Sequence, residues 1–301
     1  MESTDPSLPK LSHWPLHIVS ENNFPTAAGL ASSAAGFAAL VRAIADLYIL
    51  PHDPSFLSRI ARQGSGSACR SMFGGYVSWE MGVEEDGSDS LAQQVAPASH
   101  WPEMRAAILV VSAAKKGVSS TAGMQATVAT SEVFSQRAAH IVPLRMTRMK
   151  AAIRERDFAT FAEITMKDSN QFHAVCLDTS PPIFYLNDVS RAIIRLVEEL
   201  NRVAGKLVAA YTFDAGPNAV IYYLEDNKEW VMALLKTCFE GVPGLEDVQG
   251  KGLGEEFNIW LVKAVFGGVS RVILTGVGDG PEKVEDKSLI DEFGNPKSVA
   301  L

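Results

Sequence analysis

The stretch Asn22-Asn23-Phe24-Pro25-Thr26-Ala27-Ala28-Gly29-Leu30-Ala31-Ser32-Ser33-Ala34-Ala35-Gly36 joins a short predicted strand, Leu16–Ser20, to a long apolar predicted helix, Ser33–Tyr48. Only small residues stand where this helix begins, so its first backbone amides are accessible to an anion, and the helix dipole favours negative charge there. Ser32 and Ser33 suit either helix capping or hydrogen bonding to phosphate oxygens. A tight packing turn would use the same residues, and the Gly-Lys-Ser/Thr ending of a Walker A loop is absent. The stretch indicates either a phosphate loop of another type or a packing turn.

The rest of the chain alternates helices and strands in an α+β pattern, with boundaries set by hydrophobic periodicity, prolines and glycines. The expected helices are Pro54–Gln63, Thr121–Ser135, Pro143–Arg156, Phe158–Phe172, Pro182–Val203 and Lys228–Phe239. The expected strands are Tyr76–Met81, Ala106–Ser112, Leu207–Phe213, Ala219–Leu224 and Arg271–Gly276. A loop around Pro97–Pro102 precedes a buried strand, so we expect two domains, residues 1–102 and 103–301.

A second loop, Gly64-Ser65-Gly66-Ser67-Ala68-Cys69-Arg70-Ser71, places hydroxyls and flexible residues ahead of an arginine. Serine hydroxyls, backbone amides and a guanidinium together suit a phosphate or a carboxylate. A Ser/Gly linker followed by a surface arginine has the same composition. Cys69 is expected to be a packing residue, because no histidine stands near it in the sequence as a candidate base.

A third loop, Tyr211-Thr212-Phe213-Asp214-Ala215-Gly216-Pro217-Asn218-Ala219, carries one carboxylate at the end of a strand. Catalytic groups often project from strand ends and loops. An aspartate before glycine and proline also commonly closes a turn by accepting hydrogen bonds from backbone amides. The residues alone leave both interpretations open.

Other polar groups give weaker signals. Lys115 and Lys116 read as a solvated turn, with phosphate binding as the alternative. In the string Met166–His173 we expect His173 to be a satisfied structural histidine, with Ser169 and Asn170 as candidates for lining a cleft. The six histidines and three cysteines show no zinc-ligand spacing.

Composition excludes several classes of protein. The formal net charge of −8 argues against coating nucleic acid or an acidic membrane, because both need a basic face. The chain has 47% apolar residues but no uninterrupted apolar run of the length that spans a bilayer. Three widely spaced cysteines fit a reducing compartment, so we expect a cytoplasmic protein.

The quoted stretches resemble a known family. Residues 25–34 are similar to the phosphate loop of the GHMP small-molecule kinases, and the longer string 22–36 resembles mevalonate diphosphate decarboxylase specifically. The strings 64–71, 166–173 and 211–219 resemble the same family. The resemblance runs from about His17 to Asp247 and resumes at Arg271–Pro281, whereas Gly250–Gly268 fits the family poorly.

The resemblance implies a two-domain α+β GHMP kinase fold. Its N-terminal domain would be like domain 2 of ribosomal protein S5, here incomplete, and its C-terminal domain ferredoxin-like. The implied reaction is the ATP-dependent conversion of mevalonate 5-diphosphate to isopentenyl diphosphate, ADP, phosphate and carbon dioxide, in the mevalonate pathway of isoprenoid and sterol biosynthesis. ATP with Mg²⁺ and a homodimeric assembly are further implications, with no nucleic acid or membrane partner.

The resemblance also implies roles for single residues. Asp214 would be the catalytic acid/base facing the substrate hydroxyl, and Arg70 would face the substrate carboxylate. Ser65, Gly66 and Ser67 would bind the diphosphate end. The implied ATP contacts are Asn23, Pro25, Ala28, Gly29, Leu30, Ala31, Ser32 and Ser33, with Ser33 also taken as catalytic.

The start of the sequence also departs from the family pattern, in addition to Gly250–Gly268. Family members begin with further strands that carry a lysine and a tyrosine, and nothing comparable precedes Leu16. We therefore expect a sheet edge and part of the apolar face of the helix Ala34–Leu47 to lack their usual cover. Two alternative functions stay open: a GHMP kinase that phosphorylates without decarboxylating, and an inactive chain that only binds nucleotide or a partner subunit.

Overall fold

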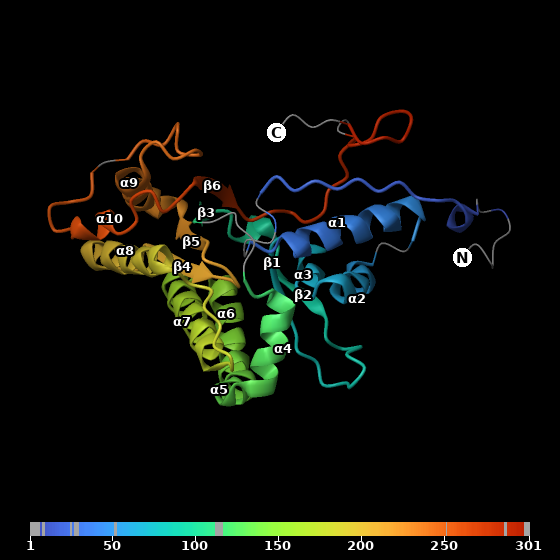
Figure 1. The fold of residues 1–301 in the computed structure, drawn as a ribbon, viewed down its shortest axis with the longest axis horizontal. Helices are drawn as coiled ribbons and strands as arrows, with labels where there is room; N and C mark the ends of the chain where they lie inside the picture. The colour runs from blue at the N-terminus through green and yellow to red at the C-terminus, as the bar shows by residue number, and fades with distance from the viewer. Residues whose placement is uncertain are drawn as a thin grey trace.

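The structure is a computed structural model that describes residues 7, 10–24, 26, 30–50, 53–111, 117–250, 252–285 and 288–297. The α+β class expected from the sequence is confirmed, because helices surround a two-stranded and a four-stranded antiparallel sheet. Figure 1 shows the helices α1–α3 and the small sheet at one end of the molecule and the larger sheet with α6–α10 at the other.

The helices α1 (Ser32–Leu47), α2 (Pro54–Gly64) and α3 (Ala68–Ser71) form a small unit. Its core consists of Ala34, Ala38, Ala45, Leu57, Ala61, Ala68 and Met72. The helices α1 and α2 approach closely at Gly64, where a Cβ would fall 2.1 Å from the Phe37 ring. On α1, Phe37 and Leu47 nevertheless remain 38% and 46% exposed, so the apolar face of this helix is only partly covered by the described residues.

The small sheet is a hairpin of β1 (Tyr76–Trp79) and β2 (Ala92–Ala96). Tyr76, Ala96 and Trp101 belong to the main hydrophobic core, together with residues of the larger sheet. Tyr76 donates a hydrogen bond to the Trp101 carbonyl at 2.8 Å and stacks on its ring. The hairpin is therefore fixed to the larger sheet through shared packing.

The larger sheet has the order β4-β5-β3-β6, and all its neighbours are antiparallel. Its strands are β3 (Met104–Val110), β4 (Ala209–Phe213), β5 (Ala219–Leu224) and β6 (Arg271–Gly276). Val220 pairs with both Thr212 and Ile108. Because side chains directly opposite each other point to the same face, these three form a row on one face of the sheet.

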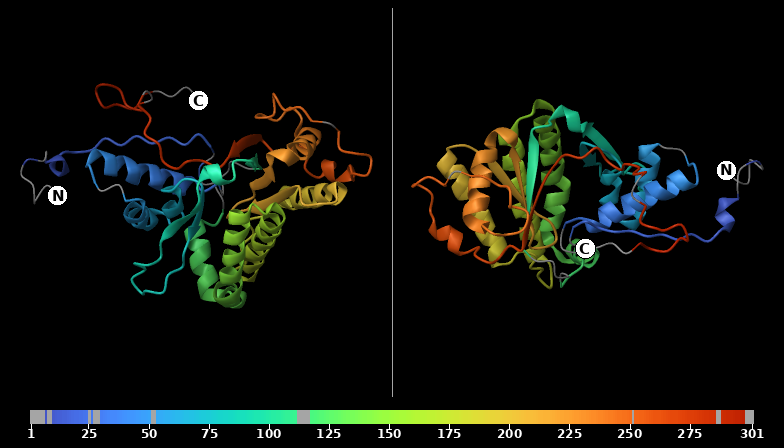
Figure 2. Two further views of the ribbon diagram at one scale, coloured as in Figure 1. Left: turned by 180° about the vertical axis from the view of Figure 1, so that it is seen from behind. Right: turned by 90° about the horizontal axis from the view of Figure 1, so that it is seen from above.

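Helices cover the larger sheet from different sides. Figures 1 and 2 show α6 (Val142–Glu155) and α7 (Phe158–Asp178) on a different side of the sheet from α8 (Asp188–Ala204) and α9 (Lys228–Phe239). The remaining helical segments are η1 (Leu11–His13), η2 (Ala98–His100), α4 (Ser120–Thr130), α5 (Glu132–Gln136), the π-helical turn η3 (Arg137–Ile141), η4 (Glu225–Asn227) and α10 (Trp260–Lys263).

The expected strand Leu16–Ser20 is wrong. Residues 15–20 are largely exposed and form no strand, because no other strand in the described part of the chain pairs with them. Instead this segment lies beside the C-terminal segment, where His17 Nδ1 is 3.1 Å from the Gly294 carbonyl oxygen (Figure 1).

Three expected helices differ in their ends. The helix predicted over Thr121–Ser135 is two, because Ser131 ends α4 and its hydroxyl accepts from the Phe134 amide to begin α5. The helix predicted to start at Pro182 starts at Asp188, because Asn187 and Ser190 form a reciprocal capping box. The helix predicted to end at Phe172 continues to Asp178, and its added turn buries Val175 and Cys176. The prediction also missed β2, α3 and α10.

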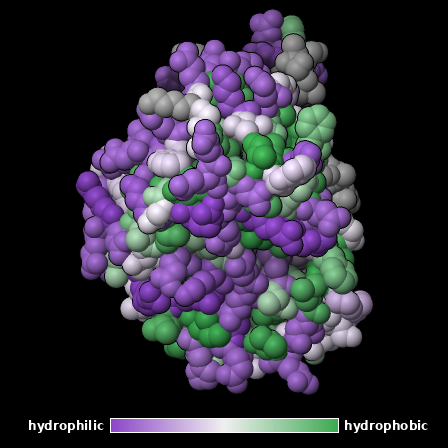
Figure 3. Space-filling model, turned by 90° about the vertical axis from the view of Figure 1, so that its left-hand side faces the viewer, coloured by the Kyte–Doolittle hydropathy of each residue, from purple (hydrophilic) through white to green (hydrophobic). Residues whose placement is uncertain are grey.

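One face of the molecule is mostly polar. Figure 3, which looks at the side of α8 and α10, shows hydrophilic side chains predominating, with apolar ones in separate small groups. Among the described helices, none combines the length and the hydropathy that crossing a bilayer requires.

Candidate active site

A cavity of 760 Å³ lies between the larger sheet, α6, α7, α3 and the loop before α1. The row Thr212, Val220 and Ile108 contributes to its lining from the sheet. The lining residues of α7 recur at helical spacing and are Phe161, Ile164, Thr165, Asp168, Ser169 and Phe172. Those of α6 and its start are Val142, Arg145, Met146, Met149 and Ile153. One face of each helix therefore forms a wall, as 3.6-residue periodicity requires.

Asp214 lies in the cavity directly after β4. The Phe213 amide donates a hydrogen bond to Ser169 Oγ of α7 at 3.0 Å, which ties the strand end to the helix. Beyond Asp214, the buried Asn218 accepts from the Val111 amide at 2.7 Å and so holds the loop against β3. Within the described part of the chain, no turn amide hydrogen-bonds the Asp214 carboxylate. This arrangement favours the catalytic interpretation of Asp214 over a turn-closing aspartate.

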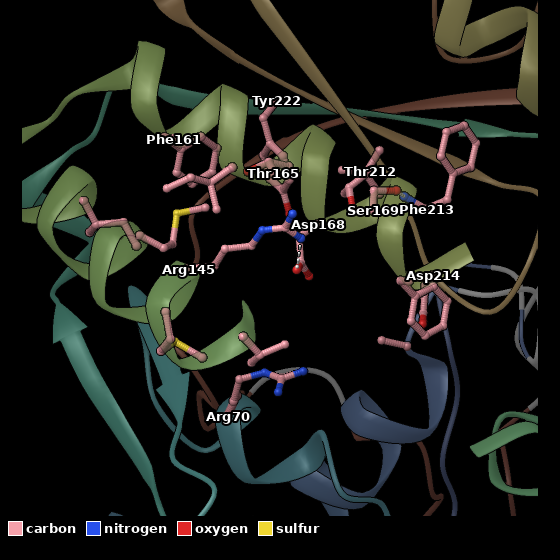
Figure 4. Close-up of a pocket in the computed structure, with 18 of the residues that line it drawn as sticks. Arg70, Arg145, Phe161, Thr165, Asp168, Ser169, Thr212, Phe213, Asp214 and Tyr222 are labelled. Carbon is pink, nitrogen blue, oxygen red and sulfur yellow. Dashed lines mark hydrogen bonds and ion pairs between the residues drawn. The ribbon is translucent and has the colours of Figure 1, made fainter. Parts of the chain in front are cut away.

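Arg70 enters the same cavity from α3, and Figure 4 shows it on a different side of the cavity from Asp214. Its guanidinium carbon lies 5.8 Å from the centroid of the Trp79 ring. That ring also covers Gly66, where a Cβ would fall 2.8 Å from it. Gly66 thus allows Trp79 to reach the position from which it contacts Arg70.

The loop before α1 also reaches the cavity. Leu30 and Ala31 line it, and Ala31 is the N-cap of α1 in the left-handed conformation with φ 56°. Alanine makes no side-chain cap, and the first turn of α1 has no acidic residue. The N-terminus of a helix in this state fits an anion such as a phosphate group.

The two serine loops predicted separately meet in the structure. Ser33 Oγ and Ser65 Oγ are 3.1 Å apart. Ser65, Gly66 and Ser67 lie just outside the residues that line the cavity, as do Ser32 and Ser33. Of the other predicted ATP contacts, Asn23 is exposed outside the cavity lining. Pro25, Ala28 and Gly29, like Lys115 and Lys116, lie outside the described residues.

Sequence reasoning missed a charged cluster in the cavity. Arg137 donates to both carboxylate oxygens of Asp168 at 2.8 Å, and Arg145 donates to Asp168 Oδ1 at 2.9 Å. Burial raises the pKa of Asp168, but the hydrogen bonds and charges of the two arginines outweigh it and hold the pKa below its usual value. The helical spacing of residues such as Arg145 and Met149 could have predicted that one face of α6 lines the cavity. Nothing in the sequence indicates that Arg137 pairs with Asp168, which lies 31 residues away.

Histidine 173 lies one turn from Ser169 on α7 and is buried between aromatic rings of Phe172, Tyr185 and Phe213. Its buried Nε2 has no hydrogen-bond partner among the described residues, so the expectation of a satisfied histidine is wrong. Burial lowers the pKa of His173 to about 4, against smaller opposing effects of the Phe213 backbone and the Asp214 charge. The imidazole is therefore neutral near pH 7.

The remaining candidate residues have different surroundings. Ser169 lines the cavity as expected, whereas Asn170 hydrogen-bonds the Tyr211 hydroxyl at 2.9 Å outside the lining. Cys69 is fully buried, and burial raises the pKa of its thiol despite the nearby charge of Arg70. The described residues contain no cluster of three or more His, Cys, Asp or Glu side chains arranged to hold a metal ion.

Comparison with known proteins identifies the family. Residues 2–92 match the diphosphomevalonate decarboxylase-like N-terminal domain, and residues 106–284 match the mevalonate 5-diphosphate decarboxylase C-terminal domain. The chain is 65% identical to the diphosphomevalonate decarboxylase mvd1 of Aspergillus fumigatus over 296 residues, which cover 95% of this chain and 73% of that protein.

Solved structures give the same result. A crystal structure of mevalonate 5-diphosphate decarboxylase at 2.3 Å resolution has a TM-score of 0.88 and 56% identity, covering 97% of this chain and 77% of its own. A complex of MDDEF with MVAPP, AMPPCP and magnesium has a TM-score of 0.67 and 30% identity, covering 85% of this chain and 68% of its own. The expected GHMP kinase fold is confirmed, and the chain belongs to the diphosphomevalonate decarboxylase family.

Proposed function

We propose that Asp214 and Arg70 are the residues with which this chain carries out the ATP-dependent decarboxylation of mevalonate 5-diphosphate. The observation that carries the proposal is that both side chains line one cavity, from β4 and α3, although 144 positions separate them in the sequence. Asp214 aligns the tertiary hydroxyl of the substrate and accepts its proton. Arg70 orients the substrate carboxylate, for which its planar fork gives a bidentate contact.

The proposed reaction forms and breaks the following bonds. The hydroxyl oxygen attacks the γ-phosphorus of ATP, the bond between that phosphorus and the bridging oxygen breaks, and ADP leaves. The carbon–oxygen bond of the new phosphate ester then breaks and releases phosphate. The bond between the carboxylate carbon and its neighbour breaks as well, carbon dioxide leaves, and its bonding electrons form the double bond of isopentenyl diphosphate. The residues of the site supply mainly positioning and charge stabilisation.

ATP and Mg²⁺ belong to the proposal. The start of α1 at Ala31, whose own side chain makes no capping hydrogen bond, fits the ATP phosphates, with Leu30, Ser32 and Ser33 beside it. Asn23 is also proposed to contact ATP, together with Pro25, Ala28 and Gly29, which belong to the same loop sequence but lie outside the described residues. The magnesium ion, when bound with ATP, would neutralise phosphate charge, and it needs few protein ligands. Ser65, Gly66 and Ser67 are proposed to contact the diphosphate of the substrate.

The test is a direct product assay. Purified chain with mevalonate 5-diphosphate, ATP and MgCl2 is expected to release ADP, phosphate and carbon dioxide in equal amounts. A stable phosphorylated product without carbon dioxide would favour a kinase instead. Binding of nucleotide without turnover, together with stimulation on mixing with an intact subunit, would favour the partner-binding alternative.

The assembly and compartment complete the proposal. A homodimer in the cytoplasm, with domains at residues 1–102 and 103–301, is the arrangement that the family resemblance implies. The three cysteines are free and buried, which agrees with a reducing compartment. Sedimentation velocity at several concentrations tests the dimer, and limited proteolysis near residue 102 tests the division of the chain.

A further inference from the structure

Arg70 is oriented by an aromatic ring instead of by a polar partner. Within the described part of the chain, no acceptor makes a hydrogen bond or an ion pair with its guanidinium. The carbon of this group lies 5.8 Å from the centroid of the Trp79 ring, within the range of cation–π attraction. Arg62, eight residues earlier, instead donates to the backbone carbonyls of Gly87 and Ser90. Two arginines of the same small unit are thus held in different ways.

A contact with a ring suits an arginine that must bind a ligand. The five N–H donors of a guanidinium point outward in its plane, whereas an aromatic ring attracts a cation over its face. A ring can therefore fix the plane of a guanidinium without occupying a donor. A carboxylate partner would occupy donors and match the positive charge, as Asp168 does for Arg137.

The Trp79 ring is itself held at two of its edges. Its Nε1 donates a hydrogen bond to Ser90 Oγ at 3.0 Å, and this hydroxyl donates to the Glu80 carbonyl at 3.0 Å. Its Cη2 atom lies so close to Gly66 that a Cβ there would fall 2.8 Å from it. A larger residue in place of Gly66 would therefore displace the ring.

The hairpin that carries Trp79 is also tied to α6, which forms one wall of the cavity. Glu80, the next residue, accepts hydrogen bonds from Lys150 Nζ of α6 at 2.5 Å and from Ser78 Oγ at 2.7 Å. The side chains of Lys150 and Glu80 are 21% and 31% exposed, so this ion pair is partly shielded from water. Met149, beside Lys150, lines the cavity. The ring therefore has a fixed position relative to that wall.

Loss of carbon dioxide needs a defined orientation of the substrate carboxylate, and this step rests on the proposed function. The carbon–carbon bond that breaks supplies the electrons of the new double bond, so it must align with the departing carbon–oxygen bond. A guanidinium that makes two parallel hydrogen bonds sets the plane of a carboxylate. A guanidinium that rotates freely would orient it poorly. Figure 4 shows the Arg70 side chain extending into the cavity from α3.

We propose that Trp79 is a positioning residue for the decarboxylation: its ring fixes the plane of the Arg70 guanidinium and leaves the donors of that group free for the substrate carboxylate. Ser90 and Gly66 set the position of the ring. A tryptophan that only stabilised the end of β1 would need no cation beside it. A tethered ring beside a guanidinium that has no acceptor among the described residues is the arrangement that carboxylate binding explains.

The experiment compares Trp79→Leu with a matched control, Trp260→Leu. Trp260 also has a cation over its ring, with Lys263 Nζ 3.9 Å from the centroid, but it is 69% exposed and lies outside the cavity lining. Calorimetry measures the binding of mevalonate 5-diphosphate and of isopentenyl diphosphate, which has a diphosphate but no carboxylate. Neither measurement requires turnover, so the inference is tested even where the proposed reaction fails.

We expect Trp79→Leu to weaken the binding of mevalonate 5-diphosphate by about 3- to 30-fold, the range that corresponds to one cation–π contact. The binding of isopentenyl diphosphate should not change, and Trp260→Leu should alter neither. Trp79→Phe keeps an aromatic face and should recover most of the affinity. In the Arg70→Gln chain, where no cation remains to be oriented, Trp79→Leu should have no further effect.

Ser90→Ala covers the case in which the leucine variant does not fold, because it keeps the ring and removes only its tether. It should weaken the binding of mevalonate 5-diphosphate by about 2- to 10-fold, as loss of one hydrogen bond does. The binding of isopentenyl diphosphate should again stay unchanged.

Four results would overturn the inference. One is a folded Trp79→Leu chain that binds mevalonate 5-diphosphate as tightly as the unsubstituted chain. Another is an equal loss of affinity for both ligands, which would show that Trp79 acts on the fold and not on the carboxylate contact. The third is a full effect of Trp79→Leu in the Arg70→Gln chain. The fourth is no binding of mevalonate 5-diphosphate by the unsubstituted chain.

Failure of the proposed function gives a different result. An unsubstituted chain that binds mevalonate 5-diphosphate, but releases no carbon dioxide with ATP and MgCl2, would contradict the reaction. The comparison of the Trp79 variants would still decide whether the ring orients Arg70 toward the carboxylate.

Discussion

The hydroxyl of Ser169 accepts a hydrogen bond from the backbone amide of Phe213 at 3.0 Å, one residue before Asp214. Both residues are buried, so this bond is shielded from water and the amide has no ready substitute partner. It joins α7 to the end of β4. The position of the Asp214 carboxylate therefore depends on a helix that is distant in the sequence.

Replacing Ser169 with alanine should lower kcat by about tenfold with a smaller effect on KM, because an unsatisfied buried amide costs about 1–3 kcal/mol and loosens the strand end. Ser169→Thr keeps the hydroxyl and should recover much of the rate. Ser135→Ala on the exposed surface of α5 is the control. Equal loss of kcat in the alanine and threonine variants would show that the hydroxyl does not position Asp214.

Asp214→Asn should reduce kcat by about 100- to 10,000-fold with little loss of substrate affinity, because the amide keeps the shape but cannot accept the hydroxyl proton. Steady-state kinetics and equilibrium binding of mevalonate 5-diphosphate separate the two effects. Asp226→Asn, at an exposed position of η4, controls for the loss of a negative charge. A loss of less than tenfold would remove Asp214 from the mechanism.

Arg70→Lys should release carbon dioxide much more slowly, although the charge is retained, because an ammonium group cannot reproduce a two-pronged carboxylate contact. The stacking of Arg70 over Trp79 would also change, since it depends on the planar guanidinium. Carbon dioxide release measured against ADP release isolates this step. Near-normal decarboxylation would mean that Arg70 contributes only diffuse positive charge.

His173 should make the protein less stable in mild acid. Its pKa is lowered to about 4 in the folded chain, against 6.5 for an ordinary histidine, so between these values the unfolded chain binds a proton that the folded chain does not. The free energy of unfolding contributed by this residue is thus constant above about pH 6.5 and falls as the pH decreases toward 4. Between pH 7 and pH 5 the loss should be about 2 kcal/mol.

Urea unfolding at pH 7 and pH 5 tests this prediction. The His173→Gln variant should lose most of the difference between the two pH values, whatever its absolute stability. His140→Gln, at an exposed site, should keep it. The same pH dependence in the His173→Gln variant and the unsubstituted chain would show that other groups produce it.

Local signals predicted much of the fold. Asp53 and Pro54 mark the start of α2, and Asp214 was correctly placed directly after a strand. The strand β2 was missed because Gln93 and Gln94 make its sequence polar, and its structure depends on pairing with β1. The strand expected at 16–20 has the apolar residues of a strand, but it does not form because no strand in the described part of the chain pairs with it.

Candidate site residues could be predicted from the sequence where they lie within one short loop. The loops of Arg70 and Asp214 each carried such a signal, and the structure brings both to one cavity. The contacts of Arg137 and Arg145 with Asp168 form only when η3, α6 and α7 pack together, so no local sequence pattern predicted them. The same holds for the contact between Ser33 and Ser65.

The most direct test of the central claim is the ratio of carbon dioxide to ADP formed from mevalonate 5-diphosphate and ATP by the purified chain. The account predicts equal amounts of both, with Asp214→Asn abolishing the two together. ADP formation with a phosphorylated product and no carbon dioxide would contradict it. So would carbon dioxide release that proceeds at the same rate in the Asp214→Asn variant.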